Sequence, residues 1–470
     1  MIVLALILVP FTGALAAFLP LKNAGRCLLF LAVTLVHAGL VASCWKQLPP
    51  PQFDGALVLD PLGLIMLSID TVLFLSLAVY MIGYFEHEQR NNRYFMACLL
   101  FVLSAMSVVA VSYHMGLLWV SVETTTLLSA PLISFHRTPQ SLEATWKYLL
   151  ICSVGIALAL MGTFFLAIAA HDVHTLLLPS LLNGAPLLLV NWLKLSVIFL
   201  FVGYGCKMGL APTHSWKPEA YGQATGMVVV VMAGALTQCA FLALLRVSQI
   251  CHRTGLGEFY GSILILSGFL SLVVPALFVL GERNIKRAFA YSSIEHMGLL
   301  VLGLGLGGAG VFGALFHMIN NALAKVIMFF TAGSIAQKYG SSRVGDVRGI
   351  LHVYPVTGMF LIVAFLAGTG MFPFATFHSE LMILNAAIAS RQYVLAAAVV
   401  ACLALVFVGI GRIILDAAHG EATAPVLEKK ENLFMNTAIG LGAAGLVVLG
   451  VWLPVPLERV IRAAAALVGG

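Results

Sequence analysis

Three apolar stretches decide the fold of this chain: LLWVSVETTTLLSAP (residues 117–131), FVGYGCKMGLAPTHSW (residues 201–216) and LFHMINNALAKVIMFF (residues 315–330). Each carries a charged side chain, Glu123, Lys207 or Lys325, within an apolar run long enough to cross a bilayer. A charge at that depth costs at least about 2.5–3.5 kcal/mol on insertion scales. Such a side chain is therefore expected to pair with an opposite charge or to take part in function. Charges of both signs in several spans indicate a path for ions through a membrane.

The composition predicts an integral membrane protein. Of the 470 residues, 61% are hydrophobic and 9% are charged, whereas a globular domain carries about 25% charged residues. The net charge of +6 does not come from a basic cluster or a basic helix, so it does not indicate a nucleic-acid partner. Residues 1–20 lack a basic start and a cleavage site and are interpreted as a first membrane span.

The eight cysteines do not predict a metal centre. They form no C-x-x-C pair, and most lie within apolar runs, where a free thiol behaves as a small hydrophobe. The sequence also contains no P-loop, no dinucleotide fingerprint and no H-E-x-x-H helix. We therefore expect no cofactor, zinc site or iron–sulfur cluster in this chain, and neither ATP hydrolysis nor NAD binding.

The apolar runs predict an all-α bundle of about 14 transmembrane helices. Two of them are interrupted, the seventh at Gly209 and Pro212 and the twelfth at Gly370 and Pro373. Interrupted helices at corresponding positions of two halves are typical of transporters built from inverted repeats. We therefore expect two inverted five-helix repeats with broken helices 7 and 12.

This arrangement divides the chain into four parts. Residues 1–93 are expected to form three N-terminal helices, and residues 94–250 the first repeat, helices 4–8. Residues 251–416 form the second repeat, helices 9–13. Residues 417–470 form the last helix and a short amphipathic tail.

Lysine and arginine gather in the loops that the prediction numbers as odd, with Lys217, Lys286 and Lys338 among them. Few lie in the even loops, chiefly Lys46 and Arg253. By the positive-inside rule the odd loops are cytoplasmic. The chain is then a multi-pass protein of a prokaryotic cytoplasmic membrane with both termini outside.

Glu123 and Lys207 are candidates for a movable ion pair. Burial destabilises the charged form of a lone lysine, and a nearby carboxylate restores it. Separating the two groups would therefore let Lys207 release a proton. A static pair that holds two helices together is the alternative.

A ladder of polar groups follows one face of a later helix, where His317, Asn321 and Lys325 are spaced four residues apart. Histidine titrates near neutral pH and can relay protons, although a lone buried histidine is often only a hydrogen-bonded core residue. Glu380, just past the second break, is a candidate for the exit carboxylate or an interfacial residue near a helix end.

Four further polar residues are assigned lesser roles. His214, after the first break, either carries protons toward the cytoplasmic surface or caps the helix. Gln238 is a candidate for holding water between the charged groups. Glu295 and His296, at an expected helix start, are interpreted as structural or interfacial residues.

Five stretches carry a family resemblance: WVSVETTTLLSAPL (119–132), KMGLAPTHSWKPEA (207–220), ERNIKRAFAYSSIEHMGL (282–299), FHMINNALAKVIMFFTAGS (316–334) and GTGMFPFATFHSEL (368–381). They resemble the antiporter-like proton-translocating membrane subunits of complex I, multisubunit cation/proton antiporters and membrane-bound hydrogenases. In that family a glutamate of the fifth helix pairs with a lysine of the seventh, a lysine or histidine group lies centrally, and a lysine or glutamate of the twelfth helix ends the path. The resemblance implies these roles for Glu123, Lys207, His317 with Lys325, and Glu380.

Within the family, the stretches at 137–165 and 291–299 look most like component F of hydrogenase-4-type and formate-hydrogenlyase-type complexes. This implies neighbouring membrane subunits and a soluble hydrogenase-like arm as partners, with nickel–iron and iron–sulfur centres in those partners. The chain departs from many relatives at Gln238, where they have a lysine, at Asn321, where they have a histidine, and in PEAYGQATGM (218–227).

The sequence thus predicts a subunit that moves protons inside an energy-converting redox complex, while the redox chemistry happens in other subunits. Whether the subunit belongs to an enzyme is left open. Two alternatives also stay open: a sodium/proton antiporter subunit without a redox partner, and a membrane anchor that does not pump.

Overall fold

The computed structural model describes residues 1–86, 91–420 and 431–469, and these residues form an all-helical membrane protein. Residues 421–430 of the predicted C-terminal part lie outside the described residues. Extended backbone in the described ranges is limited to isolated bridges such as that between Gln52 and Leu57. The predicted fold class is confirmed.

The first part of the chain contains α1 (Ile2–Ala16), α2 (Asn23–Lys46), α3 (Pro61–Tyr84), α4 (Arg93–Val111), α5 (Met115–Ile133) and α6 (Pro139–Ala169). The middle contains α7 (Leu178–Asn183), α8 (Val190–Met208), α9 (Trp216–Gln223), α10 (Gly226–Val231), a π-helical turn η3 (Met232–Leu236), α11 (Thr237–Arg253), α12 (Gly257–Phe278), α13 (Ile285–Leu306) and α14 (Ala309–Tyr339). The last part contains α15 (Ile350–Val353), α16 (Pro355–Gly368), α17 (Ala375–Ala389), α18 (Tyr393–Ala418), α19 (Leu433–Val451) and α20 (Val455–Val468).

Eleven helical segments of the described chain are long and apolar enough to cross a membrane. One of them joins α10, η3 and α11 into a single segment of 28 residues. The other three crossings of the predicted bundle are the 15-residue α1 and the two interrupted pairs, α8 with α9 and α16 with α17.

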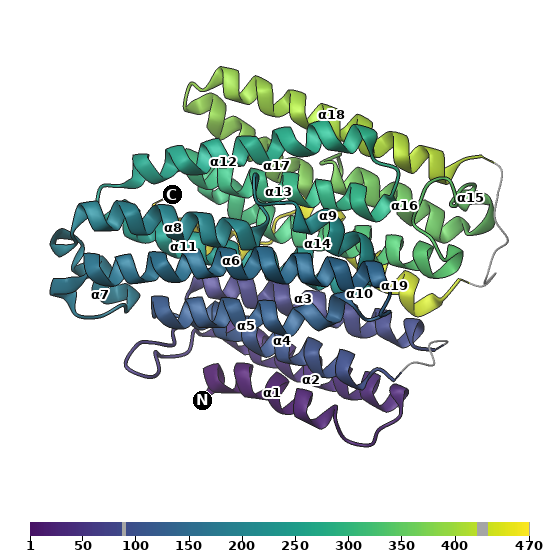
Figure 1. The fold of residues 1–470 in the computed structure, drawn as a ribbon, viewed down its shortest axis with the longest axis horizontal. Helices are drawn as coiled ribbons and strands as arrows, with labels where there is room; N and C mark the ends of the chain where they lie inside the picture. Colours follow the sequence, from purple (N-terminus) through teal and green to yellow (C-terminus); the bar gives the residue numbers. More distant parts are fainter. Residues whose placement is uncertain (87–90, 421–430, 470) are drawn as a thin grey trace.

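The helices form a bundle in which outer helices enclose a set of central helices. Figure 1 shows α1 and α2 along one edge and α18 along the opposite edge, with α11 and α14 between them. The segment from α10 to α11 is completely buried in its apolar window, whereas α2 and α18 are only 39% buried there. The buried helices form the protein's interior, and α2 and α18 present apolar surface to lipid.

Both interrupted helices break at a glycine. Gly209 follows α8 with φ of 78°, and Gly370 follows α16 with φ of 62°, a region that costs glycine little and other residues more. In each case a proline stands three residues later, Pro212 or Pro373, before the next helix begins. The broken seventh and twelfth helices are therefore confirmed.

The prediction that Lys217 and Lys286 are loop charges was wrong. Both side chains are buried, and Lys217 is completely so. Lys286 donates from Nζ to the carbonyl oxygens of Gly222 (3.2 Å) and Ala224 (2.7 Å), where α9 ends. Its charge stabilises carbonyls at a helix C-terminus that have no partner within the helix.

Candidate functional site

Lys207 lies in the last turn of α8 and is almost completely buried. Its Nζ donates to the Thr126 hydroxyl (2.8 Å) and to the Tyr148 hydroxyl (2.7 Å). Tyr148 in turn shares a hydrogen bond of 2.8 Å with Ser129. All of these acceptors are neutral, so the lysine is positioned by hydroxyl groups from α5 and α6 and not by a counter-ion.

Glu123 and Lys207 do not form the expected ion pair. Glu123 is half-buried on α5, and its Oε1 accepts a hydrogen bond of 3.3 Å from Ser153, while its buried Oε2 has no hydrogen-bond partner among the described residues. Thr126, one turn along the same helix, holds the lysine instead. The free Oε2 shows that this carboxylate is not satisfied where it stands.

Lys325 is completely buried at the middle of α14. Its Nζ contacts the Met328 sulfur at 3.7 Å, and it interacts electrostatically with the carboxylates of Glu295 and Glu380. Neither carboxylate comes within 4.0 Å of the ammonium. Lys325 therefore interacts electrostatically with one carboxylate on α13 and one on α17, and it is hydrogen-bonded to neither in the described chain.

Two histidines and a serine form a hydrogen-bonded chain beside Lys325. His296 Nε2 lies 3.1 Å from the Gly368 carbonyl, which only accepts, so this nitrogen carries a proton. In a neutral ring Nδ1 of His296 is then an acceptor, and His317 Nε2 donates to it across 3.0 Å. By the same reasoning His317 Nδ1 accepts from Ser379 at 2.9 Å. The carbonyl at the broken helix thus sets one direction for the whole chain of donors.

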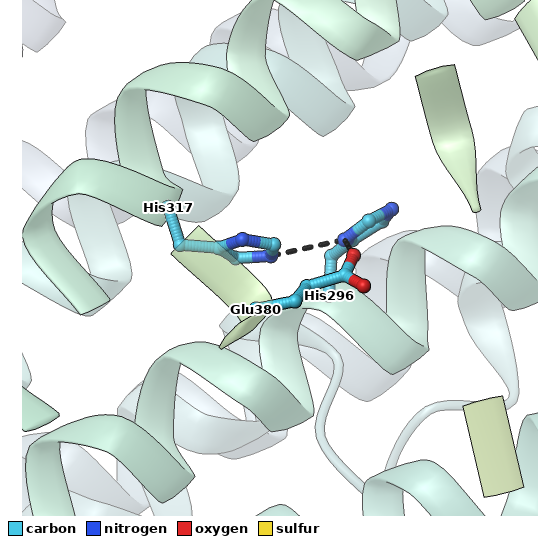
Figure 2. A group of neighbouring side chains, drawn as sticks. All are labelled: His296, His317 and Glu380. Carbon is cyan, nitrogen blue, oxygen red and sulfur yellow. Dashed lines mark hydrogen bonds and ion pairs between the residues drawn. The ribbon is translucent and has the colours of Figure 1, made fainter. Parts of the chain in front are cut away.

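Glu380 lies beside the point where the two histidine rings meet. Figure 2 shows its carboxylate beside the ring of His296, on the side where His317 approaches. Its Oε1 is 4.0 Å from His296 Nδ1, and its side chain lies so close to Gly370 that a Cβ there would collide with the carboxylate. A proton on His296 therefore has an anion within reach.

Three buried or half-buried side chains lie close enough together to hold a metal ion. One ligand atom each of His296, His317 and Glu380 lies within 4.8 Å of the others. The Nδ1 and Nε2 atoms that would face a metal are 3.0 Å apart and are joined by a hydrogen bond. The other nitrogen of each ring is also hydrogen-bonded. This geometry fits proton transfer between the rings.

The structure places the remaining predicted residues around this centre. Gln238 is completely buried and donates weakly to the Met318 carbonyl at 3.5 Å, and its own carbonyl oxygen has no partner in the described part of the chain. His214 is half-buried between α8 and α9, and its Nδ1 has no hydrogen-bond partner among the residues that the structure describes. Asn321 is completely buried, and neither of its side-chain polar atoms is hydrogen-bonded within the described ranges.

Several buried ionisable residues were missed or misjudged from the sequence. Glu295 and His296 are not interfacial, since both are buried in the central part of α13. Lys217 is completely buried in α9, and its Nζ has no hydrogen-bond partner among the described residues. Asp70 is also completely buried, in α3, and neither carboxylate oxygen is hydrogen-bonded to any part of the chain that the structure describes. The signal for Asp70 was present, because it interrupts the apolar run LIMLSIDTVLFL (64–75).

Comparison with known proteins gives consistent results for sequence and fold. The family described as NADH:quinone oxidoreductase/Mrp antiporter, TM matches residues 112–405. A hydrogenase-4 component F homolog of Methylacidiphilum infernorum is 32% identical over 415 residues, covering 85% of this chain and 86% of the relative. NADH-quinone oxidoreductase subunit N of Desulforudis audaxviator is 29% identical over 426 residues, covering 87% of this chain and 81% of the relative.

The fold is also found among solved structures. A chain of the membrane-bound sulfane sulfur reductase, an archaeal respiratory membrane complex, superposes with a TM-score of 0.89. The superposition covers 99% of this chain and 97% of the other at 21% sequence identity. At this identity the likeness concerns the fold.

Proposed function

The chain belongs to the NADH:quinone oxidoreductase/Mrp antiporter family of membrane proteins, and on that premise we propose that it moves protons across the membrane through its buried polar interior. The proposed path begins near Glu123 and Lys207 and passes Lys325. It then follows the His317 and His296 rings to Glu380 and the exit. Water bound at Gln238 and near His214 completes it.

One observation carries this proposal: the directed chain of hydrogen bonds from Ser379 through His317 and His296 to the Gly368 carbonyl. His317 can pass its Nε2 proton to Nδ1 of His296. The Gly368 carbonyl cannot take up a proton, so the proton leaves His296 from the same nitrogen, Nδ1, which lies 4.0 Å from Glu380 Oε1. The chain lies inside a membrane protein, between a lysine on α14 and a carboxylate on α17. A static scaffold would need these hydrogen bonds but not the neighbouring lysine and carboxylate, and their presence favours a relay.

Lys207 acts as the switch in the proposed cycle. In one state its ammonium is held by Thr126 and Tyr148; in the other it approaches Glu123, whose Oε2 is free to accept it. An ion pair at about 4 Å is worth about 4 kcal/mol at an effective dielectric of 20. Making and breaking that pair changes how firmly Lys207 holds its proton, and the released proton moves toward Lys325.

The proposed setting is a hydrogenase-4-like energy-converting complex of a prokaryotic cytoplasmic membrane. The hydrogenase-4 component F homolog supports this assignment, because the similarity covers most of both chains. We infer neighbouring membrane subunits and a soluble redox arm as partners, and both termini on the outer side.

The test is proton pumping by the purified complex in proteoliposomes, with redox turnover followed in parallel, for wild type and Lys207→Ala. Loss of pumping with assembly intact supports the switch. Full pumping by the alanine variant would contradict it and favour a membrane anchor. Repeating the assay with and without sodium separates a proton pump from a sodium/proton antiporter.

A further inference from the structure

We propose, on the basis of the proton-translocating function above, that Lys217 is a proton-carrying group that connects the Lys207 half of the path with the Lys325 half. Gln238, which lies at the start of α11 and near the middle of the continuous segment Gly226–Arg253, cannot titrate and therefore cannot fill that role. Lys217 was predicted as a loop charge, but the structure puts it inside the bundle.

The surroundings of Lys217 give little support to a charge on it. Its Nζ is buried and has no hydrogen-bond partner in the described chain, and it lies 6.0 Å from the centre of the Trp216 ring, at the outer limit of a cation–π contact. Burying an unpaired charge costs several kcal/mol, and replacing even a paired one by an apolar side chain is often neutral or stabilising. A buried lysine at such a site is better explained by a function than by packing.

The position of Lys217 is intermediate between the two other buried lysines. On one side, the neighbouring Trp216 ring lies 5.1 Å from the ring of Tyr148, which accepts a hydrogen bond from Lys207. On the other side, the charge of Lys217 interacts with that of Lys325. The short helix α9 packs against α6 and α13, so it lies between the two halves.

Four titratable groups from the surrounding elements feel the charge of Lys217: Cys152 on α6, His296 on α13, Lys325 on α14 and His214 before α9. Cys152 also interacts with Lys207. No carboxylate is among these groups. A charge on Lys325 therefore disfavours a proton on Lys217. This is the coupling that sequential transfer needs.

The break in α8 makes room for this side chain. The stem of Lys217 lies against Gly209, and a Cβ at that glycine would collide with it. Gly370 accommodates Glu380 in the same way at the other break. Each broken helix thus places one ionisable side chain against its glycine, and the second of them already belongs to the proposed path.

Buried hydroxyl groups lie on α9 and on the two helices α13 and α14. Tyr221 is four residues further along α9, on the same face as Lys217, and its buried hydroxyl interacts with that of Ser293 on α13. Thr331 on α14 has a buried hydroxyl without a hydrogen-bond partner among the described residues. Buried water commonly bridges such groups, so these hydroxyls offer a route from Lys217 toward Lys325.

The transfer conserves charge and involves no electrons. The ammonium of Lys207 loses a proton and becomes an amine, while the amine of Lys217 gains one through water. Lys217 then returns to the amine as Lys325 becomes the ammonium. One proton has advanced from the first repeat to the second.

The test uses three variants of Lys217 in the whole complex, reconstituted in proteoliposomes, with pumping measured per redox turnover. Lys217→Met removes the titratable group at similar length, and we expect pumping to fall tenfold or more. Lys217→Arg keeps a positive charge but does not release its proton, so we expect the same loss. Lys217→His can release a proton again, and we expect partial recovery with a pH optimum moved toward acid.

Lys286→Met is the matched control, because it removes another buried lysine whose Nζ is bonded to two carbonyls. We expect it to keep pumping per assembled complex. Wild-type pumping by Lys217→Arg would overturn the proposal, since a static cation would then suffice. If Lys217→Met does not assemble, the Arg and His variants decide.

These outcomes separate this inference from the proposed function. If wild type and Lys207→Ala pump equally or not at all, the proposed function fails. If Lys207→Ala abolishes pumping while all three Lys217 variants pump normally, only the role of Lys217 fails.

Discussion

The sharpest prediction concerns the hydroxyl of Tyr148. This group accepts a hydrogen bond of 2.7 Å from the Lys207 ammonium, and the tyrosine ring lies 5.0 Å from the same nitrogen. Tyr148→Phe removes the hydroxyl and keeps the ring, so packing is preserved. Lys207 then retains only Thr126 as an acceptor.

The size of the effect follows from the lost bond. A hydrogen bond to a charged group contributes about 1.5–3 kcal/mol, and each 1.36 kcal/mol changes an equilibrium about tenfold. The charged form of Lys207 should therefore lose roughly 10- to 150-fold in population relative to the neutral form. A lysine that no longer holds its proton through the cycle delivers fewer protons per turnover.

The assay is proton pumping per redox turnover in proteoliposomes across a range of pH. We expect Tyr148→Phe to pump at a tenth of the wild-type yield or less near neutral pH, with recovery at lower pH. The matched control is Tyr204→Phe, because Tyr204 is equally buried on α8 and its hydroxyl has no partner. A Tyr148→Phe complex with wild-type yield and pH profile would refute the assignment of this hydroxyl as a support of Lys207.

Two further predictions concern the exit relay and the frame that holds the helices. Ser379→Ala removes the donor to His317 Nδ1. A neutral hydrogen bond is worth about 0.5–1.5 kcal/mol, so pumping should fall about 2- to 10-fold. Ser379→Thr keeps a hydroxyl and should pump normally; equal pumping by the two variants would count against the relay. Asp60, at the start of α3, makes a bidentate ion pair with Arg246 on α11 (2.6 and 2.8 Å), and Asp60→Asn should cost about 3–5 kcal/mol of stability, measured as the melting temperature in detergent. Burial raises the pKa of Asp60, but the charge and hydrogen bonds of Arg246 outweigh it and leave that pKa below its ordinary value. The stabilisation is therefore complete above about pH 4 and lost as the pH falls further; an acid melting profile that is the same in wild type and variant would contradict this.

The sequence predicted those parts of the site whose signal lies within one helix. Lys207 and Lys325 stand out because each is a charge in an apolar run, and the structure buries both. The helix breaks were predictable because glycine and proline act on their own backbone. The orientation of a single side chain relative to another helix has no such local signal, which is why the direct contact between Glu123 and Lys207 was expected but not found.

The residues that were misjudged lie deeper inside the protein than the sequence indicated. Glu295 and His296 were placed near a helix start, but α13 extends from Ile285 to Leu306 and both residues lie at its middle. Lys217 follows a helix break and precedes Pro218, a context that resembles a loop, yet α9 folds back into the bundle. A loop charge and a buried charge look alike in sequence when the segment between two spans is itself buried.

The charges of the interior give a last argument for a path and against a scaffold. Lys207, Lys217 and Lys325 are buried cations, and Glu295 and Glu380 are the acids nearest the last of them. None of these lysines lies within 4.0 Å of a carboxylate among the described residues. An ion pair that existed for stability would be closed, because only a close and well-bonded pair offsets the cost of burial. Open spacing costs stability, but it lets each group change its charge when a neighbour does. The interior is therefore built so that the number of protons it holds can change, and that change is what a proton pump requires.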